Sequence, residues 1–432
     1  MITQRRFRIA APGGILLGLL MLGSPWSALA ASGWSPAVAI SPSQPSTTPS
    51  AFAIDPAGHE LWVAAPPVAG GYAIEVAQRS FGGTWSPQTT IFSSTNGFVA
   101  TVNKIYVSIG ANNTASVAWQ VGFAVLVALR SPSGIWQAPV TISPGSGTAN
   151  SLVAKADAQG NGVAVWSQMT NLASAVDAVT WTASGSFSGV TQLSGLSPSE
   201  LMPDLAVNEA GTAIAVFAAA TTPGGSSYQT YSATRPAGGN WSAATPISPI
   251  TGGASGAVAL DGSGNATVVW EQGTSIASST RPNGGSWSSP TVLETAAIVV
   301  PASVASDAAG NLTAVWAVDS GNGVTSVHAA TRPAGSPWGA PANLGACSSQ
   351  NCVPLLAAAR DGSIAVVSFT GESNGLSVAV RLGQGTWSSS VVGSGSTRIT
   401  NLIAGNNAVA SAVWPANIKT KYHVGLDQSD FR

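Results

Sequence analysis

An aromatic residue, followed by a small residue at seven of eight positions, returns about every fifty residues along this 432-residue chain. Seven of these aromatic residues are tryptophan and one is phenylalanine: Trp34, Trp85, Trp136, Phe187, Trp241, Trp287, Trp338 and Trp387. Successive positions are 51, 51, 51, 54, 46, 51 and 49 residues apart. A period this regular indicates one supersecondary unit that is copied and stacked, so the chain is predicted to be a repeat protein.

Each repeat has the pattern of four short strands joined by stereotyped turns. In the sixth repeat we expect strands at residues 302–307, 312–316, 324–331 and 338–344. An Asp-x-x-Gly turn joins the first two strands, as at Asp157, Asp261 and Asp307; its carboxylate bonds backbone amides and its glycine takes a left-handed conformation. An Arg-Pro-x-Gly-Gly-x-Trp hairpin joins the last two, as at Arg235 and Arg281, and its arginine is placed to stack on the tryptophan.

Four antiparallel strands in about fifty residues, repeated, are typical of the blades of a β-propeller. The prediction is therefore an all-β chain with a single β-propeller of eight four-stranded blades. The second and eighth units, near residues 110–119 and 405–414, are degenerate, so seven blades are the alternative. Because a fourth-type strand opens the chain at Trp34 and a third-type strand closes it, we expect the N-terminal strand to complete the last blade and close the ring.

The repeated aromatic positions are interpreted as core packing. Of the fourteen tryptophans after residue 30, twelve occupy either the fourth-strand position or a second position in the second strand. Only Trp62 and Trp181 stand outside this pattern. The arginine of the second hairpin recurs in six repeats, so it is interpreted as structural as well.

Residues 1–30 have the parts of a secretory signal peptide. A basic start is followed by the apolar run 15–22 and by the small-x-small sequence Ala28-Leu29-Ala30. Residues 31–432 are then the propeller domain, and a secreted or periplasmic location is expected. Cys347 and Cys352 are predicted to form a disulfide bond that closes a small loop in this oxidising compartment.

Composition narrows the classes of partner. Charged residues make up 8% of the chain and only four are lysine, so nothing indicates binding to nucleic acid. No later segment has the pattern of a membrane span, and the protein is expected to be a monomer. No Ser-His-Asp arrangement, phosphate loop or cluster of metal ligands is visible, so neither a cofactor nor a metal is expected.

The two ends of the propeller differ in their loops. The first-to-second and third-to-fourth turns of each blade share one end, named here the turn face, and they are short and stereotyped. The second-to-third turns and the connections between blades share the other end, the variable face, where repeat proteins usually place function. The residues expected there as a ligand site, near the mouth of the central channel, are Asp204, Glu271 and Arg398, with Asp319 and Glu200.

The Asp-x-x-Gly-Asn turn and the Arg-Pro-x-Gly-Gly-x-Trp-Ser hairpin resemble the repeats of secreted bacterial β-propellers with sialidase-like, Asp-box-type repeats. The resemblance covers nearly all of the chain after residue 30 and implies the fold. It does not extend to the catalytic set, since sialidases hold the substrate carboxylate with three arginines. Here six of the nine arginines after residue 30 belong to the hairpin, Arg360 lies in the turn face, Arg432 is terminal, and Arg398 alone is free on the variable face.

Three functions remain as hypotheses. The first is an exported, non-enzymatic propeller that binds a carbohydrate or a protein through its variable face. The second is a glycoside hydrolase or polysaccharide lyase with a carboxylate pair among Asp204, Glu271, Asp319 and Glu200. The third is a structural or assembly component of the cell envelope.

Each hypothesis predicts a different surface. An enzyme needs two carboxylates that converge in one deep pocket, a scaffold needs a broad apolar patch, and a lectin with repeated sites needs several similar pockets with aromatic platforms. The recurring residues belong to tight turns and core positions. One individual site, or docking to a protein, is therefore favoured over repeated sites.

Overall fold

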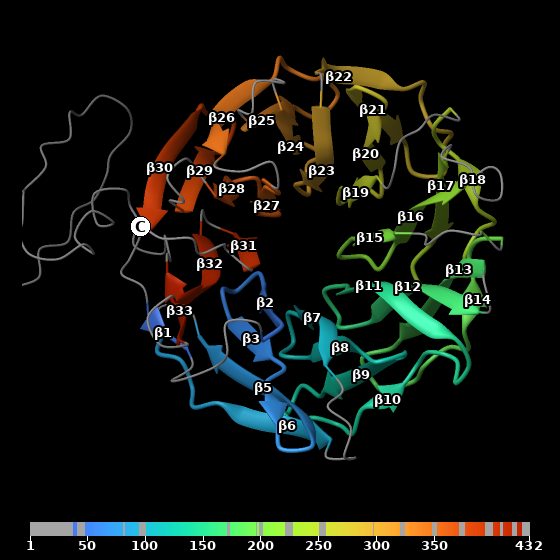
Figure 1. The fold of residues 1–432 in the computed structure, drawn as a ribbon, viewed down its shortest axis with the longest axis vertical. Coiled ribbons are helices and arrows are strands. Elements are labelled where there is room, and N and C mark those ends of the chain that lie inside the picture. The colour runs from blue at the N-terminus through green and yellow to red at the C-terminus, as the bar shows by residue number, and fades with distance from the viewer. Residues whose placement is uncertain are drawn as a thin grey trace, which may run out of the picture.

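The computed structural model describes residues 38–40, 48–80, 83–94, 101–170, 173–195, 197, 202–220, 228–249, 256–296, 298–319, 325–347, 352–370, 376–393, 401–406, 409–416 and 421–425. These residues form eight antiparallel sheets arranged in a ring (Figure 1). Consecutive strands of each sheet lie side by side, with the first strand of every blade nearest the centre. The all-β fold and the eight blades predicted from the repeat are confirmed.

The first four blades follow the chain in order. Blade one contains β2 (Ser50–Ile54), β3 (Glu60–Ala64), β4 (Pro67–Val68), β5 (Gly71–Arg79) and β6 (Thr89–Ser94). Blade two contains β7 (Val102–Ile109), β8 (Ala115–Val121), β9 (Ala124–Arg130) and β10 (Val140–Thr141). Blade three contains β11 (Thr148–Ala156), β12 (Gly162–Thr170), β13 (Ala173–Trp181) and β14 (Thr191–Gln192). Blade four contains β15 (Asp204–Val207), β16 (Ala213–Ala220), β17 (Tyr228–Arg235) and β18 (Thr245–Pro246).

The remaining blades complete the ring. Blade five contains β19 (Ala257–Leu260), β20 (Ala266–Gln272), β21 (Ser275–Arg281) and β22 (Thr291–Thr295). Blade six contains β23 (Ile298–Ser306), β24 (Leu312–Asp319), β25 (Thr325–Arg332) and β26 (Ala342–Cys347). Blade seven contains β27 (Leu355–Ala358), β28 (Ile364–Thr370), β29 (Leu376–Leu382) and β30 (Trp387–Gly393). Blade eight contains β31 (Asn401–Gly405), β32 (Val409–Ala416), β33 (Lys421–Gly425) and the N-terminal β1 (Val38–Ala39).

The N-terminal strand closes the ring as predicted. β1 pairs antiparallel with β33, in the register Val38 to Val424 and Ala39 to His423. The two ends of the described chain thus share one sheet, and the closing blade keeps its fourth strand. The predicted signal peptide, residues 1–30, lies outside the described residues.

The fourth strands of blades one to six begin later than the sequence pattern predicted, whereas β30 of blade seven begins at Trp387 itself. In the sixth repeat the expected strand was 338–344, whereas β26 spans Ala342–Cys347. Proline follows the repeated tryptophan within a few residues in several hairpins, as Pro139 follows Trp136 immediately before β10. Because proline has no N–H to donate, the regular ladder starts beyond it in these hairpins, and the tryptophan lies in the hairpin instead of the strand.

The second-strand aromatic residues form the centre of the packing between sheets, as predicted. Trp119, Trp166, Trp270, Trp316 and Phe217 are each at most 1% exposed. Trp62, which the repeat did not explain, is fully buried beside Phe52 in the first blade. The core is therefore a series of apolar clusters between neighbouring blades, five of which contain one of these aromatic side chains.

The hairpin arginines stack on the hairpin tryptophans in four blades, which confirms the predicted cation–π contact. The pairs are Arg79 with Trp85, Arg130 with Trp136, Arg281 with Trp287 and Arg381 with Trp387, at 5.2–5.8 Å from guanidinium carbon to ring centroid. In blade three the arginine is replaced by Trp181, which pairs with Gly162 as Arg79 pairs with Glu60. Trp181 thus has a repeat position after all, and it is the position of the arginine.

The predicted disulfide bond is present. Cys347 at the end of β26 is bonded to Cys352, with the two Cα atoms 5.9 Å apart. Both residues are buried in the packing between blades six and seven. No helix with the length and apolar character of a bilayer span occurs among the described residues.

Candidate functional site

The acidic residues of the Asp-x-x-Gly turns are bound by their own turns. Asp157 Oδ1 accepts the amides of Gln159 and Asn161, each at 2.9 Å, and its Oδ2 accepts Asn161 Nδ2 at 2.9 Å. The glycine of the next blade packs against this carboxylate, since a Cβ on Gly211 would lie 2.9 Å from Asp157 Oδ2. These carboxylates therefore hold the turns and the joints between blades.

Replacing Asp307 with alanine is expected to lower the free energy of unfolding by about 1–3 kcal/mol. The change removes the acceptor for the Asn311 amide at 2.9 Å and for its side-chain Nδ2 at 2.6 Å. Urea denaturation followed by circular dichroism measures the loss. Asp361→Ala is the control, because Asp361 is exposed in the corresponding turn region of blade seven; an equal loss in both variants would show that the buried carboxylate has no special role.

Two cavities lie at equivalent places on the turn face, each between neighbouring blades. The blade 1–2 pocket has a volume of about 630 Å³ and is lined by His59, Glu60, Gln78, Arg79, Ser80, Thr84, Trp85, Ser86, Pro87, Ile109, Ala111, Asn112 and Asn113. The blade 3–4 pocket has a volume of about 400 Å³ and is lined by Asp157, Gln159, Asn161, Gly162, Val163, Thr180, Trp181, Thr182, Ser186, Phe187, Ser188, Val207, Ala210, Gly211, Arg235, Ala237 and Gly238. In both, the two turns of one blade face the first turn of the next, and in the blade 3–4 pocket the second hairpin of blade four also contributes.

The blade 1–2 pocket contains an internally balanced ion pair. Arg79 is paired with Glu60 across the ladder and its guanidinium stacks on Trp85 at 5.2 Å. His59 Nδ1 lies 2.7 Å from Asp55 Oδ2 at the edge of the same pocket. The pocket therefore presents an aromatic ring beside polar groups whose charges are already matched.

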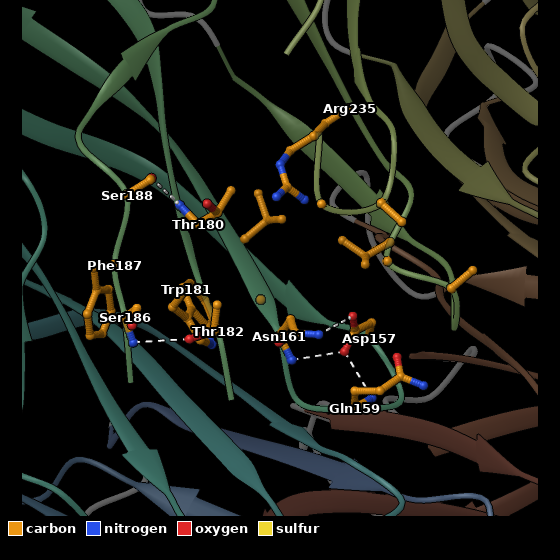
Figure 2. A pocket seen from close by; sticks show the side chains of 17 residues that line it. Asp157, Gln159, Asn161, Thr180, Trp181, Thr182, Ser186, Phe187, Ser188 and Arg235 are labelled. Atoms are coloured by element: carbon orange, nitrogen blue, oxygen red, sulfur yellow. Dashed lines mark hydrogen bonds between the residues drawn. The ribbon is translucent and has the colours of Figure 1, made fainter. Parts of the chain in front are cut away.

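The blade 3–4 pocket has a different composition at the same positions (Figure 2). Trp181 and Phe187 form its aromatic wall, with ring centroids 6.4 Å apart. The positive charge comes from the next blade, since Arg235 lies at the end of β17 and its side chain lines the pocket (Figure 2). Hydroxyl and amide groups of the two turns surround these side chains.

A third cavity, of about 390 Å³, lies at the turn-face end of the central channel, lined by first strands and turns of several blades. Glu209 of blade four and Arg360 of blade seven form an ion pair across it, with Oε1 and Nε 3.1 Å apart. Burial lowers the pKa of Arg360, and the charge of Glu209 raises it. This ion pair links blades that are distant in the chain and narrows the channel.

The residues predicted for a site on the variable face are not brought together in these three cavities. Asp204 Oδ2 accepts the amide of Val258 at 2.9 Å, which ties blade four to blade five. Burial raises the pKa of Glu271 on β20, and Asp319 is buried at the end of β24. Glu200 and Arg398 lie outside the described residues.

A hydrogen-bonded chain that the sequence did not indicate joins blades five and six. Ser326 Oγ lies 3.0 Å from His328 Nε2, and His328 Nδ1 lies 2.9 Å from Glu294 Oε2. The same carboxylate oxygen also accepts Trp316 Nε1 at 2.6 Å. Residues 294 and 328 belong to different blades, so the sequence alone carried no signal for their contact.

The hydrogen-bonded series Ser326, His328 and Glu294 has the order of a Ser-His-Glu triad, but the serine lies in a different backbone environment. Ser326 lies in the middle strand of its sheet, paired with Val318 on one side and Ala346 on the other, whereas a nucleophilic serine sits on a sharp turn that exposes its oxygen beside amide donors. The fully buried Trp316 also donates a hydrogen bond to the Glu294 carboxylate. We therefore interpret the chain as a polar tie between two blades. Within the described residues, no group of three or more His, Cys, Asp and Glu side chains is arranged to hold a metal.

Comparison with known proteins supports the fold. No family model matches the chain, and no curated protein matches its sequence. Among solved structures, the BP39L lectin from Burkholderia pseudomallei is similar at a TM-score of 0.56 and 14% identity, covering 81% of this chain and 99% of the lectin chain. The Penicillium chrysogenum α-L-arabinanase complexed with arabinobiose has a TM-score of 0.43 at 13% identity, with 81% of this chain and 98% of that chain covered.

A further similar structure is YCF48 bound to D1 peptide, with a TM-score of 0.45, 15% identity, and coverage of 91% of this chain and 94% of that chain. The ring of eight antiparallel sheets and the likeness to the lectin agree that the chain is a β-propeller. At these identities the likeness concerns the fold. Function has to be argued from the pockets themselves.

Proposed function

We propose that this protein is an exported, non-enzymatic β-propeller that binds saccharides in the pockets between blades on its turn face. The observation that carries the proposal is the pair of equivalent pockets, each with an aromatic wall, an arginine and several polar side chains. Several similar pockets with aromatic residues are what distinguishes a repeated-site lectin from an enzyme with one deep site. Repeated sites were not expected from the sequence because no recurring exposed residues occur on the variable face. These pockets lie at the other end, on the turn face.

The chemistry of the pockets suits a sugar ring. Their volumes lie in the range of about 300–1,000 Å³ that is usual for small-molecule sites. The apolar face of a pyranose packs on aromatic rings, while arginine, asparagine and hydroxyl groups bond its hydroxyls. The B. pseudomallei neighbour is by name a lectin, which agrees with a saccharide as ligand. The predicted signal peptide and the disulfide bond favour an oxidising, extracytoplasmic location for this activity.

Filling the pockets is expected to abolish binding without unfolding the protein. Ala111→Trp in the blade 1–2 pocket and Ala237→Trp in the blade 3–4 pocket each add a large side chain at an exposed lining residue. On a glycan array, we expect the unchanged protein to bind selectively and the double variant to bind at least about tenfold more weakly, a loss of about 1.4 kcal/mol or more.

The matched control places the same side chain at the other end of the propeller. Thr274→Trp lies in the exposed turn between β20 and β21, on the variable face, and should leave binding unchanged. Melting temperatures of all variants, measured by circular dichroism, establish that they fold. Absence of binding by the unchanged protein, or full binding by the double variant, would overturn the proposed function.

A further inference from the structure

Almost all hairpin arginines of this propeller form hydrogen bonds or ion pairs with other residues of the same chain. Arg130 Nη1 donates to Gln78 Oε1 at 2.6 Å, and Arg281 Nη1 donates to Thr234 Oγ1 at 3.2 Å. In both cases the arginine extends back to the residue that precedes the hairpin arginine of the previous blade. Arg79 pairs with Glu60, Arg332 donates to Ser336 O within its hairpin, and Arg381 donates to Gly383 O of its hairpin and to Thr313 Oγ1 of blade six.

Arg235 is the exception among these six residues. The corresponding partner in the previous blade would be Thr180, which precedes Trp181, yet the guanidinium of Arg235 makes no hydrogen bond to Thr180 or to any other side chain or carbonyl of the described residues. Arg235 also does not stack on Trp241, whereas Arg281 stacks on Trp287. The guanidinium instead lines the blade 3–4 pocket (Figure 2).

The surroundings of Arg235 leave its donors available to a ligand. Burial lowers the pKa of Arg235, while the charge of Asp157 raises it. Asp157 does not satisfy the guanidinium directly, because its two oxygens accept three hydrogen bonds from Gln159 and Asn161. A half-buried guanidinium with unused donors favours a ligand that supplies two acceptor oxygens in one plane.

We propose that the blade 3–4 pocket selects a saccharide that carries an anionic group, bound by the Arg235 guanidinium while the sugar ring packs on the Phe187 side. Planar bidentate pairing with a carboxylate, or with two oxygens of a sulfate, gives the strongest hydrogen bonds that this guanidinium can form. This inference rests on the proposed saccharide function and names the class of ligand for one of its two pockets.

The blade 1–2 pocket is expected to differ in selectivity. Both pockets contain an acidic side chain, but Glu60 is paired directly with the Arg79 guanidinium, whereas Asp157 of the blade 3–4 pocket is hydrogen-bonded by its own turn. At the same two positions blade three has Trp181 and Gly162, which removes both charges. Uncharged saccharides are therefore the expected ligands of the blade 1–2 pocket.

The test uses matched acidic and neutral saccharides on one array: oligogalacturonides with their methyl esters, and sulfated with unsulfated galactosides. The unchanged protein should bind acidic members at least about tenfold better at the blade 3–4 pocket, and Arg235→Gln should remove that preference while neutral binding persists. Arg235→Lys, which keeps the charge but not the planar fork, should restore only part of it. Arg332→Gln is the control, since Arg332 bonds its own hairpin.

The possible outcomes distinguish a failure of the acidic-ligand proposal from a failure of the proposed saccharide-binding function. Neutral binding that is blocked by Ala237→Trp, with no acidic preference or no effect of Arg235→Gln, overturns the acidic ligand but keeps the saccharide function. No binding to any saccharide overturns both. Melting temperatures of the arginine variants within a few degrees of the unchanged protein show that a loss of binding is not a loss of fold.

Discussion

Replacing Trp166 with alanine is expected to lower the free energy of unfolding by about 3–5 kcal/mol. Trp166 is fully buried between blades two and three, in contact with residues of both sheets. Its Nε1 donates to Gln168 Oε1 at 2.8 Å, so truncation leaves a cavity and also a buried acceptor without its donor. Urea denaturation at equilibrium, followed by circular dichroism, measures the change.

Phe123→Ala is the matched control for this prediction. Phe123 is also aromatic but is 68% exposed in the turn between β8 and β9. Its truncation is expected to change the free energy of unfolding by no more than about 0.5 kcal/mol. Similar effects of the two substitutions would contradict the assignment of the second-strand aromatic residues to the core.

The stability of the propeller is expected to fall as the pH rises from about 4 to about 6, through the titration of Asp177. Burial raises the pKa of this carboxyl from 3.8 to about 6. The folded state therefore keeps a proton that the unfolded state has already lost, so between these values ionisation favours unfolding. A difference of about two pH units corresponds to about 3 kcal/mol, present below pH 4 and lost above pH 6.

Asp177→Asn isolates this contribution. The amide cannot ionise, so the variant should lack this part of the pH dependence and should be more stable than the unchanged protein at pH 7. Urea denaturation of both proteins at several pH values between 4 and 7 gives the difference directly. Asp361→Asn, an exposed position, is the control and should follow the unchanged protein; parallel curves for Asp177→Asn and the unchanged protein would contradict the raised pKa.

The repeat made the architecture readable from the sequence. Turn residues at fixed offsets and one aromatic position in each second strand were sufficient to predict eight blades and the closing strand β1. Each blade uses the same kinds of turn and the same core position, so the pattern recurs along the sequence. The start of the fourth strands was misplaced because the hairpin aromatic residue was taken as part of the strand. Proline after that residue was the signal that would have corrected it.

The pockets were not predicted, because they form between blades from residues that each blade uses for its own turns. A repeated residue was taken as structural, and for Arg79 and Arg130 its contacts agree with that. The replacement at Trp181 is visible in the sequence, 51 residues after Arg130 and 54 before Arg235. It marks the blade whose interface with the next one has changed, and it leaves Arg235 without its usual partner.

Contacts between blades also explain the other surprises. Asp204 was predicted as a ligand-binding residue at the channel mouth, and its carboxylate accepts the amide of Val258 in the next blade. Glu294 and His328 meet only because blades five and six are packed together. A single sequence without covariation carries no signal for such pairs. A ligand site formed by Asp204, Glu271 and Asp319, together with Glu200 and Arg398, remains a prediction.

A structure of the protein with its best-binding saccharide tests the central claim most directly. Crystals soaked with the strongest ligand from the array are expected to contain the sugar between blades on the turn face, against Trp85 in the blade 1–2 pocket or against Phe187 and Arg235 in the blade 3–4 pocket. A saccharide bound instead on the variable face, beside Asp204 and Glu271, would contradict the account and restore the site first predicted from the sequence.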